Sequence, residues 1–191
     1  MARHEYEWDE TIDGKVIPKR TDPTNHNMIK GTLTSLFVNH LWRREMPEYF
    51  AGVGVFLTDR DIYMPDGALV TDPRQLKPDG VHGAPALAVE ILSYRTARYD
   101  RGRKRDIYEQ CGVPEYWIIS PEERSIERYL LRDGKFALDN VYYQYPKYAF
   151  EDADPEELPE MITEFHCDAL PDLTISTDYV FERVMDFPFD D

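Results

Sequence analysis

Two acidic residues, Asp66 and Glu90, stand in apolar runs of this 191-residue chain. Asp66 precedes the segment GALV, and Glu90 lies inside the segment ALAVEIL. A carboxylate on an apolar strand is costly unless another group compensates its charge. A divalent cation shared by Asp66 and Glu90, with Lys104 nearby, would supply that compensation. The arrangement therefore predicts metal-dependent chemistry on a phosphate.

The proposed donors are hard oxygen atoms, namely the Asp66 and Glu90 carboxylates and the Ile91 backbone carbonyl, which suit Mg²⁺ or Mn²⁺. Such a cation lowers the pKa of a bound water and stabilises charge on phosphate oxygens, while the Lys104 ammonium would position the water or stabilise the transition state. Each residue also has a structural alternative. Asp66 would be a turn acid and Glu90 a buried partner of an arginine. Lys104 would form a solvated pair with Asp100, worth about 0.3–0.5 kcal/mol.

Charge is distributed unevenly along the chain. The formal net charge of −15 argues at first sight against nucleic acid, but residues 150–191 carry 14 of the acids and only one base. Residues 94–105 hold six bases and one acid. This local patch predicts phosphate contacts from Arg95, Arg98, Arg101 and Arg103. The acidic C-terminal region could oppose that binding or cover the patch.

Hydrophobic spacing indicates the elements that position these residues. Helices are expected over about 25–44, 99–111 and 175–186, an N-terminal hairpin over 5–19, and strands over 51–57, 64–71, 86–92, 115–120 and 125–131. The helix between the strands 86–92 and 115–120 is a crossover, so these strands should be parallel neighbours. The sequence predicts an α/β fold with a mixed central β-sheet flanked by helices, and it places Lys104 near the end of the Glu90 strand.

Three segments together carry a family resemblance: PDGALVTDP, GAPALAVEILS and TARYDRGRKRDIYEQCGVPEYWIISP. They resemble the Uma2 family, also called DUF820, whose members are described as restriction endonucleases with the PD-(D/E)XK nuclease fold. The similarity covers roughly residues 5–135, and it includes His26 and the helix that follows. It implies a restriction-endonuclease-like core over about 20–135, with an acidic C-terminal extension over about 150–191, in a single domain of residues 1–191.

Carried over to this sequence, the resemblance implies that Asp66 is the acid of the PD motif and Glu90 the acid of the (D/E)XK motif. Leu92 stands at the usual lysine position. The resemblance implies that Lys104 on the next helix takes over that lysine's role. Arg103 or Arg105 could take this place instead if the helix were rotated.

The function expected from the residues and the resemblance is a Mg²⁺-dependent (or Mn²⁺-dependent) endonuclease that hydrolyses phosphodiester bonds of DNA. The alternative is a catalytically inactive nuclease-fold protein that binds nucleic acid or another protein. Cys111 and Cys167 have no partner motif, which favours a reducing, cytoplasmic location. No apolar run approaches the roughly 20 residues of a membrane helix. A homodimer would suit double-strand cleavage.

Overall fold

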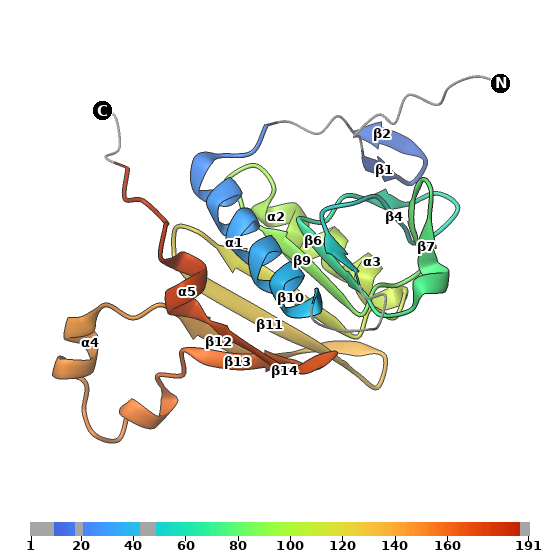
Figure 1. Ribbon diagram of the computed structural model, residues 1–191. Helices are drawn as coiled ribbons and strands as arrows, with labels where there is room; N and C mark the ends of the chain where they lie inside the picture. Colours follow the sequence, from blue (N-terminus) through green and yellow to red (C-terminus); the bar gives the residue numbers. More distant parts are fainter. Residues whose placement is uncertain (1–9, 18–20, 43–48, 188–191) are drawn as a thin grey trace.

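A mixed six-stranded sheet lies at the centre of the computed structural model, which describes residues 10–17, 21–42 and 49–187 (Figure 1). Its strands lie in the order β12 (Lys135–Tyr143), β11 (Ser125–Arg132), β10 (Glu115–Ser120), β9 (Leu87–Ile91), β6 (Gly67–Val70) and β3 (Tyr49–Ala51). Strands β9 and β10 are parallel, as predicted. All residues of both strands are buried, which explains their continuous apolar character.

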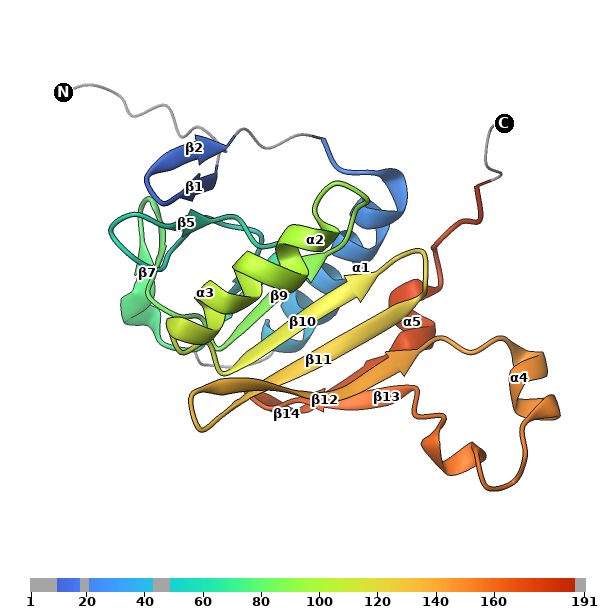
Figure 2. The ribbon, with the colours of Figure 1, turned by 180° about the vertical axis from the view of Figure 1, so that it is seen from behind.

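Helices cover both faces of this sheet (Figures 1 and 2). Helix α1 (Thr24–Leu41) packs on one face through the buried residues Ile29, Leu33 and Phe37. The Phe37 ring stacks on Phe50 with the ring centroids 4.1 Å apart. The α/β fold class predicted from the sequence is therefore confirmed.

The opposite face carries the crossover between β9 and β10. It consists of α2 (Ala97–Tyr99), the π-helical turn η2 (Asp100–Lys104) and α3 (Arg105–Gln110). Tyr108 and Tyr116 are fully buried beneath it, with their ring centroids 5.1 Å apart. No helix in the described ranges is long and apolar enough to cross a lipid bilayer.

A second six-stranded sheet of short strands stands beside the first. In spatial order it contains β2 (Lys15–Ile17), β1 (Glu10–Ile12), β5 (Ile62–Tyr63), β4 (Val55–Phe56), β8 (Gly80–His82) and β7 (Leu76–Lys77), with the 3-10 turn η1 at Pro73–Gln75. Strands β1 and β2 confirm the N-terminal hairpin, of which residues 5–9 and 18–19 lie outside the described residues. The predicted strand over 51–57 is divided between the two sheets.

The C-terminal region contributes to the main core. It contains α4 (Lys147–Asp152), the 3-10 turn η3 (Leu158–Glu160), β13 (Glu164–Cys167), β14 (Leu170–Ser176) and α5 (Thr177–Phe181). Phe165, Ile175 and Phe181 are buried in the same cluster as the apolar face of α1. The segment over about 150–191 is thus more than an acidic extension, because its hairpin alternates buried and exposed positions.

A buried arginine fastens this hairpin to the main sheet. The Arg128 guanidinium on β11 donates to Glu115 at 2.7 Å and to Asp139 at 2.9 Å, and it also donates to Asp168 in the β13–β14 turn. Glu115 accepts the Asp168 backbone N–H at 2.9 Å as well. The charged groups therefore compensate one another where the hairpin meets β10 and β11.

Candidate active site

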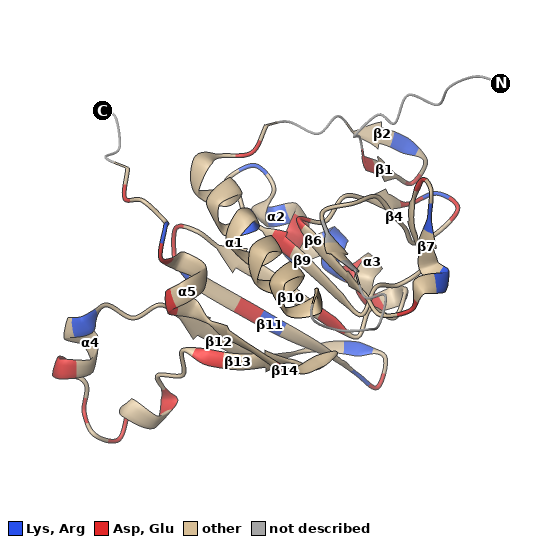
Figure 3. Ribbon diagram, in the orientation of Figure 1, with Lys and Arg blue, Asp and Glu red and all other residues tan. Residues whose placement is uncertain are grey.

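A cavity of about 780 Å³ lies where the N-terminal hairpin, the start of α1, the end of β9 and the α2–η2 crossover meet. Asp66, Glu90 and Lys104 all line it, so the structure brings together the three residues that the sequence singled out. Figure 3 shows acidic and basic positions meeting in this central region of the molecule. The acidic lining residues outnumber the basic ones, which favours a cation in the cavity.

Glu90 points from β9 toward the crossover helix and is 3% exposed. Lys104 Nζ donates to its Oε2 at 3.0 Å, and the Tyr108 hydroxyl donates to its Oε1 at 2.9 Å. Burial raises the pKa of Glu90 well above its ordinary value, and the Lys104 charge offsets only part of this shift. Glu90 is thus an ion-pair partner in a buried polar network, and its partner is a lysine, whereas the structural alternative was an arginine.

Lys104 is surrounded by carboxylates. Its Nζ lies 2.8 Å from Glu10, 3.0 Å from Glu90 and 3.6 Å from Asp100. Burial alone would lower the pKa of Lys104, but the three carboxylates outweigh it and raise the pKa well above the ordinary value. The ammonium therefore stays charged. The solvated Lys104–Asp100 pair is wrong, because both side chains are almost fully buried.

The π-helical turn η2 decides which base faces the cavity. It directs Asp100 and Lys104 inward, while Arg103 forms an ion pair with Asp13 of the N-terminal hairpin. The Arg105 guanidinium lies over the Tyr129 ring, 5.5 Å from its centroid. Of the three bases considered for this place, Lys104 is the one that reaches Glu90.

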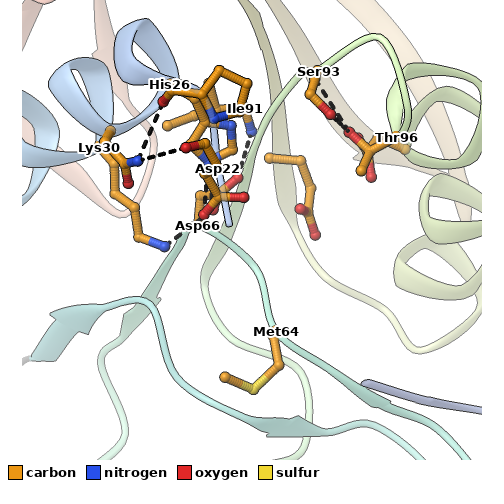
Figure 4. A network of polar contacts seen from close by, with 12 residues as sticks. Asp22, His26, Lys30, Met64, Asp66, Ile91, Ser93 and Thr96 are labelled. Atoms are coloured by element: carbon orange, nitrogen blue, oxygen red, sulfur yellow. Dashed lines mark hydrogen bonds and ion pairs between the residues drawn. The ribbon is translucent and has the colours of Figure 1, made fainter. Parts of the chain in front are cut away.

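Asp66 lies just before β6 and is 5% exposed. The antiparallel register pairs Gly67 with Val89, so the next position along brings Asp66 opposite Glu90. Its Oδ2 accepts the Ile91 backbone N–H at 2.9 Å, and its Oδ1 accepts a hydrogen bond from Lys30 Nζ at 3.1 Å (Figure 4). The group of Ile91 that meets Asp66 is therefore the N–H, and a ligand role for its carbonyl stays a prediction.

The four predicted phosphate-binding arginines differ in their exposure and in their ion-pair partners. Arg95 is exposed and lines the cavity. Arg98 is exposed and lies outside the cavity lining. Arg101 donates to Glu127 at 2.6 Å, and Arg103 is paired with Asp13. Arg101 and Arg103 are thus held by acids of the chain itself.

Helix α1 supplies site residues that sequence reasoning missed. His26 is 4% exposed and lies with Lys30 beside Asp66 (Figure 4). Asp22, which precedes the helix, lies beside them. Positions 26 and 30 are four residues apart and so share one face of α1, which is the signal that could have found His26 and Lys30. The donor set of carboxylates and a buried imidazole fits a divalent cation.

The comparisons with known proteins agree with this architecture. The Uma2 family model, described as "Putative restriction endonuclease", matches residues 2–173. The chain belongs to the Uma2 family. The match extends beyond the region 5–135 seen from the motifs and takes in β13 and the first part of β14. Two relatives illustrate what this Uma2 protein is similar to.

The first is a Synechocystis sp. protein described as "Uncharacterized protein slr1290", which is 29% identical over 133 residues, covering 69% of this chain and 67% of the relative. The second is a crystal structure from Anabaena variabilis, described as "a putative nuclease belonging to DUF820". It superposes with a TM-score of 0.63 at 17% identity, covering 93% of this chain and 91% of that chain. This likeness confirms the restriction-endonuclease-like fold.

Proposed function

We propose that this Uma2 protein is a metal-dependent endonuclease that hydrolyses phosphodiester bonds of DNA. The observation that carries the proposal is the convergence of Asp66, Glu90 and Lys104 on one cavity from three separate elements. The family membership supports a nuclease activity. To this family-level activity the proposal adds DNA as the substrate, a divalent cation, and a role for each site residue.

The carboxylates of Asp66 and Glu90, with the Ile91 carbonyl, would hold Mg²⁺ or Mn²⁺. When bound, such a cation lowers the pKa of its water and neutralises charge on the phosphate. The Ile91 N–H fixes the orientation of the Asp66 carboxylate, because it donates to Oδ2 at 2.9 Å. The Tyr108 hydroxyl does the same for Glu90. Both acids are therefore preorganised by groups that do not titrate near neutral pH.

Lys104 would hold its charge next to the attacked phosphate. Because its pKa is raised, the Lys104 ammonium stays protonated while it donates hydrogen bonds. It would therefore orient water or stabilise negative charge. Arg95 at the rim and the exposed Arg98 would contact neighbouring phosphates. Arg101 and Arg103 could do so only by exchanging their present carboxylate partners for phosphate.

A plasmid-nicking assay tests the proposal. The wild-type chain should nick supercoiled DNA with Mg²⁺ or Mn²⁺ and not with a chelator. Glu90→Gln and Lys104→Gln should each slow nicking by about a hundredfold or more, as expected for the loss of an electrostatic group at the reacting phosphate. Thermal melting of each variant separates a loss of chemistry from a loss of folding.

Asp72→Asn is the matched control, because Asp72 is a surface acid that pairs with Arg74 away from the cavity. It should nick at the wild-type rate. The proposal fails if the wild type shows no cation-dependent nicking, or if folded Glu90→Gln nicks as fast as Asp72→Asn.

One observation favours the second candidate, a nuclease fold kept as a binding module. Lys104 is enclosed by three carboxylates, and Arg101 and Arg103 are already paired, so much of the positive charge is internally compensated. This candidate predicts no nicking by the wild type together with DNA binding that weakens steeply as salt rises. A protein-interaction role would show neither nicking nor a salt-dependent DNA titration.

A further inference from the structure

His26 is the buried polar group that the proposed chemistry does not use. Its imidazole is 4% exposed, and neither ring nitrogen makes a hydrogen bond to any described residue. Its Nε2 nevertheless lies 3.0 Å from Asp66 Oδ1 and 3.7 Å from Asp22 Oδ2 (Figure 4). An imidazole nitrogen that makes no hydrogen bond to the described part of the chain but has two carboxylate oxygens within 3.7 Å is placed as a ligand that shares a cation with them would be.

The distances on this side of the cavity suit one ion. One ligand atom each from Asp22, His26 and Asp66 lie within 4.8 Å of one another. Two ligands on opposite sides of a Mn²⁺ or Zn²⁺ ion, each about 2.0–2.2 Å from it, are about 4.2 Å apart. The three groups therefore need only small side-chain rotations to reach a common centre. Asp22 has a partly exposed side chain that can make such a rotation.

Glu90 is less available to a cation than Asp22 and His26 are. Its Oε1 and Oε2 each accept a hydrogen bond from a buried donor, Tyr108 and Lys104. Withdrawing Glu90 from Lys104 would cost a buried ion pair. Lys30, the cation that touches Asp66 Oδ1, has a side chain that is 28% exposed and can rotate into solvent. Binding a cation on the α1 side of Asp66 therefore costs less free energy than binding one between Asp66 and Glu90.

We propose that the α1 side of Asp66 is a second cation site, which shares Asp66 with the first and has Nε2 of His26 and carboxylate oxygens of Asp22 and Asp66 as ligands. Because one ligand is an imidazole nitrogen, the site selects Mn²⁺ or another first-row transition ion over Mg²⁺, which takes oxygen ligands. The inference rests on the proposed function, because the site shares Asp66 with it. It adds the class of cation that the site binds. Binding is measurable without DNA.

The test uses the full-length chain with Mn²⁺ alone and Mg²⁺ alone. Calorimetric titration should show Mn²⁺ binding about tenfold or more tightly than Mg²⁺. Pulsed electron paramagnetic resonance of the Mn²⁺ complex should show modulation from an imidazole ¹⁴N nucleus. In His26→Gln the nitrogen signal should disappear and the preference for Mn²⁺ should collapse.

His82→Gln is the matched control, since His82 is an exposed histidine paired with Asp79 outside the cavity, and it should behave as wild type. Asp22→Asn serves if His26→Gln does not fold. It should weaken Mn²⁺ binding and keep the nitrogen signal. No Mn²⁺ binding, Mn²⁺ binding without a nitrogen signal, or a signal that survives in His26→Gln would overturn the inference.

The outcomes for this site and for the proposed function are separable. If the chain shows the His26-dependent nitrogen signal and cuts no DNA, the cation site is supported and the nuclease function is contradicted. A chain that cuts DNA with Mg²⁺ and shows no nitrogen signal with Mn²⁺ would lead to the reverse conclusion.

Discussion

At the scale of single residues, the site is a buried excess of acid held together by one lysine. Glu10, Glu90 and Asp100 all approach the Lys104 ammonium within 3.6 Å. Burial raises the pKa of both Glu90 and Asp100, with the Lys104 charge acting against it. Such a cluster of buried acids is stable only while the Lys104 ammonium balances its charge. The remaining negative charge attracts further cations.

Replacing that lysine should be costly. Lys104→Met leaves buried carboxylates without a counter-charge, so we expect a loss of about 3–5 kcal/mol in the free energy of unfolding. Urea denaturation measures this. Lys135→Met removes an exposed lysine from its surface pair with Glu109 and should cost at most about 1 kcal/mol. Equal effects of the two substitutions would show that the buried network does not hold the site.

The raised pKa of Glu90 has a pH signature. The folded chain keeps a proton on Glu90 at pH values above its ordinary pKa of 4.5, where the unfolded chain has released it. As pH rises through this window, the wild type therefore loses stability relative to a variant that cannot titrate. The melting temperature of Glu90→Gln, measured relative to wild type, should increase as the pH rises above 4.5.

Glu109→Gln supplies the opposite case. A hydrogen bond from Lys135 lowers the pKa of Glu109, so this carboxylate stabilises the fold above its ordinary pKa and loses that effect as the pH falls. The relative melting temperature of Glu109→Gln should therefore fall as pH rises through the region of pH 4. A Glu90→Gln difference in melting temperature that is flat or falls as the pH rises above 4.5 would contradict the raised pKa of Glu90.

At the scale of elements, the crossover and the C-terminal hairpin decide the geometry. The π-helical turn η2 sets the rotation that brings Lys104 to Glu90, and the Arg128 cluster ties β13–β14 to the sheet. Glu115 also accepts hydrogen bonds from Trp117 Nε1 and from the Asp168 N–H, so its carboxylate links β10 to the hairpin. The Glu115–Asp168 contact joins positions that are 53 residues apart in the sequence.

Arg128→Met should loosen the hairpin. The substitution leaves Glu115 fully buried without its guanidinium, for which we expect a loss of about 3–5 kcal/mol. Amide hydrogen exchange should accelerate most in β13 and β14. Arg132→Met is the control, because Arg132 is exposed and its 3.4 Å contact with Asp139 lies at the rim of the cluster. Uniform acceleration across the sheet would contradict a local role.

The predictability of these elements follows from their surroundings. The strands around Glu90 and Trp117 were predicted because strands buried on both faces read as continuous apolar runs. Strands β7 and β8 were missed because two- and three-residue strands among Gly and Pro resemble a loop. The role of Lys104 was accessible only through the family resemblance and helix spacing. The proximity of His26 to Asp66 was missed because the two residues are 40 positions apart in the sequence.

At the scale of the whole molecule, the acidic segment has two parts with different physical roles. Residues 164–184 build the core, whereas the acids over 151–160 are exposed on the arm that carries α4 and η3. Deleting residues 151–191 would remove Phe165, Ile175 and Phe181 from the core and unfold the protein. The effect of the acidity on DNA must be tested by neutralisation instead.

Neutralising the arm should strengthen DNA binding and leave the fold intact. We expect the quadruple variant Glu151→Gln, Asp152→Asn, Glu156→Gln, Glu160→Gln to melt as wild type, because all four side chains are exposed. Its non-specific affinity for duplex DNA should rise about two- to tenfold at low salt, since the long-range repulsion is reduced. Fluorescence anisotropy measures this. Unchanged affinity would show that the arm does not act on DNA.

In the function that we propose, Asp66 anchors cation-dependent DNA hydrolysis in the cavity. The most direct test is the single-turnover cleavage rate of an end-labelled DNA duplex by wild type and Asp66→Asn at saturating Mn²⁺. Asparagine keeps the shape of the side chain and removes its charge, so we predict a cleavage rate at least about a hundredfold lower, with the melting temperature retained. A folded Asp66→Asn that cleaves at the wild-type rate would contradict it.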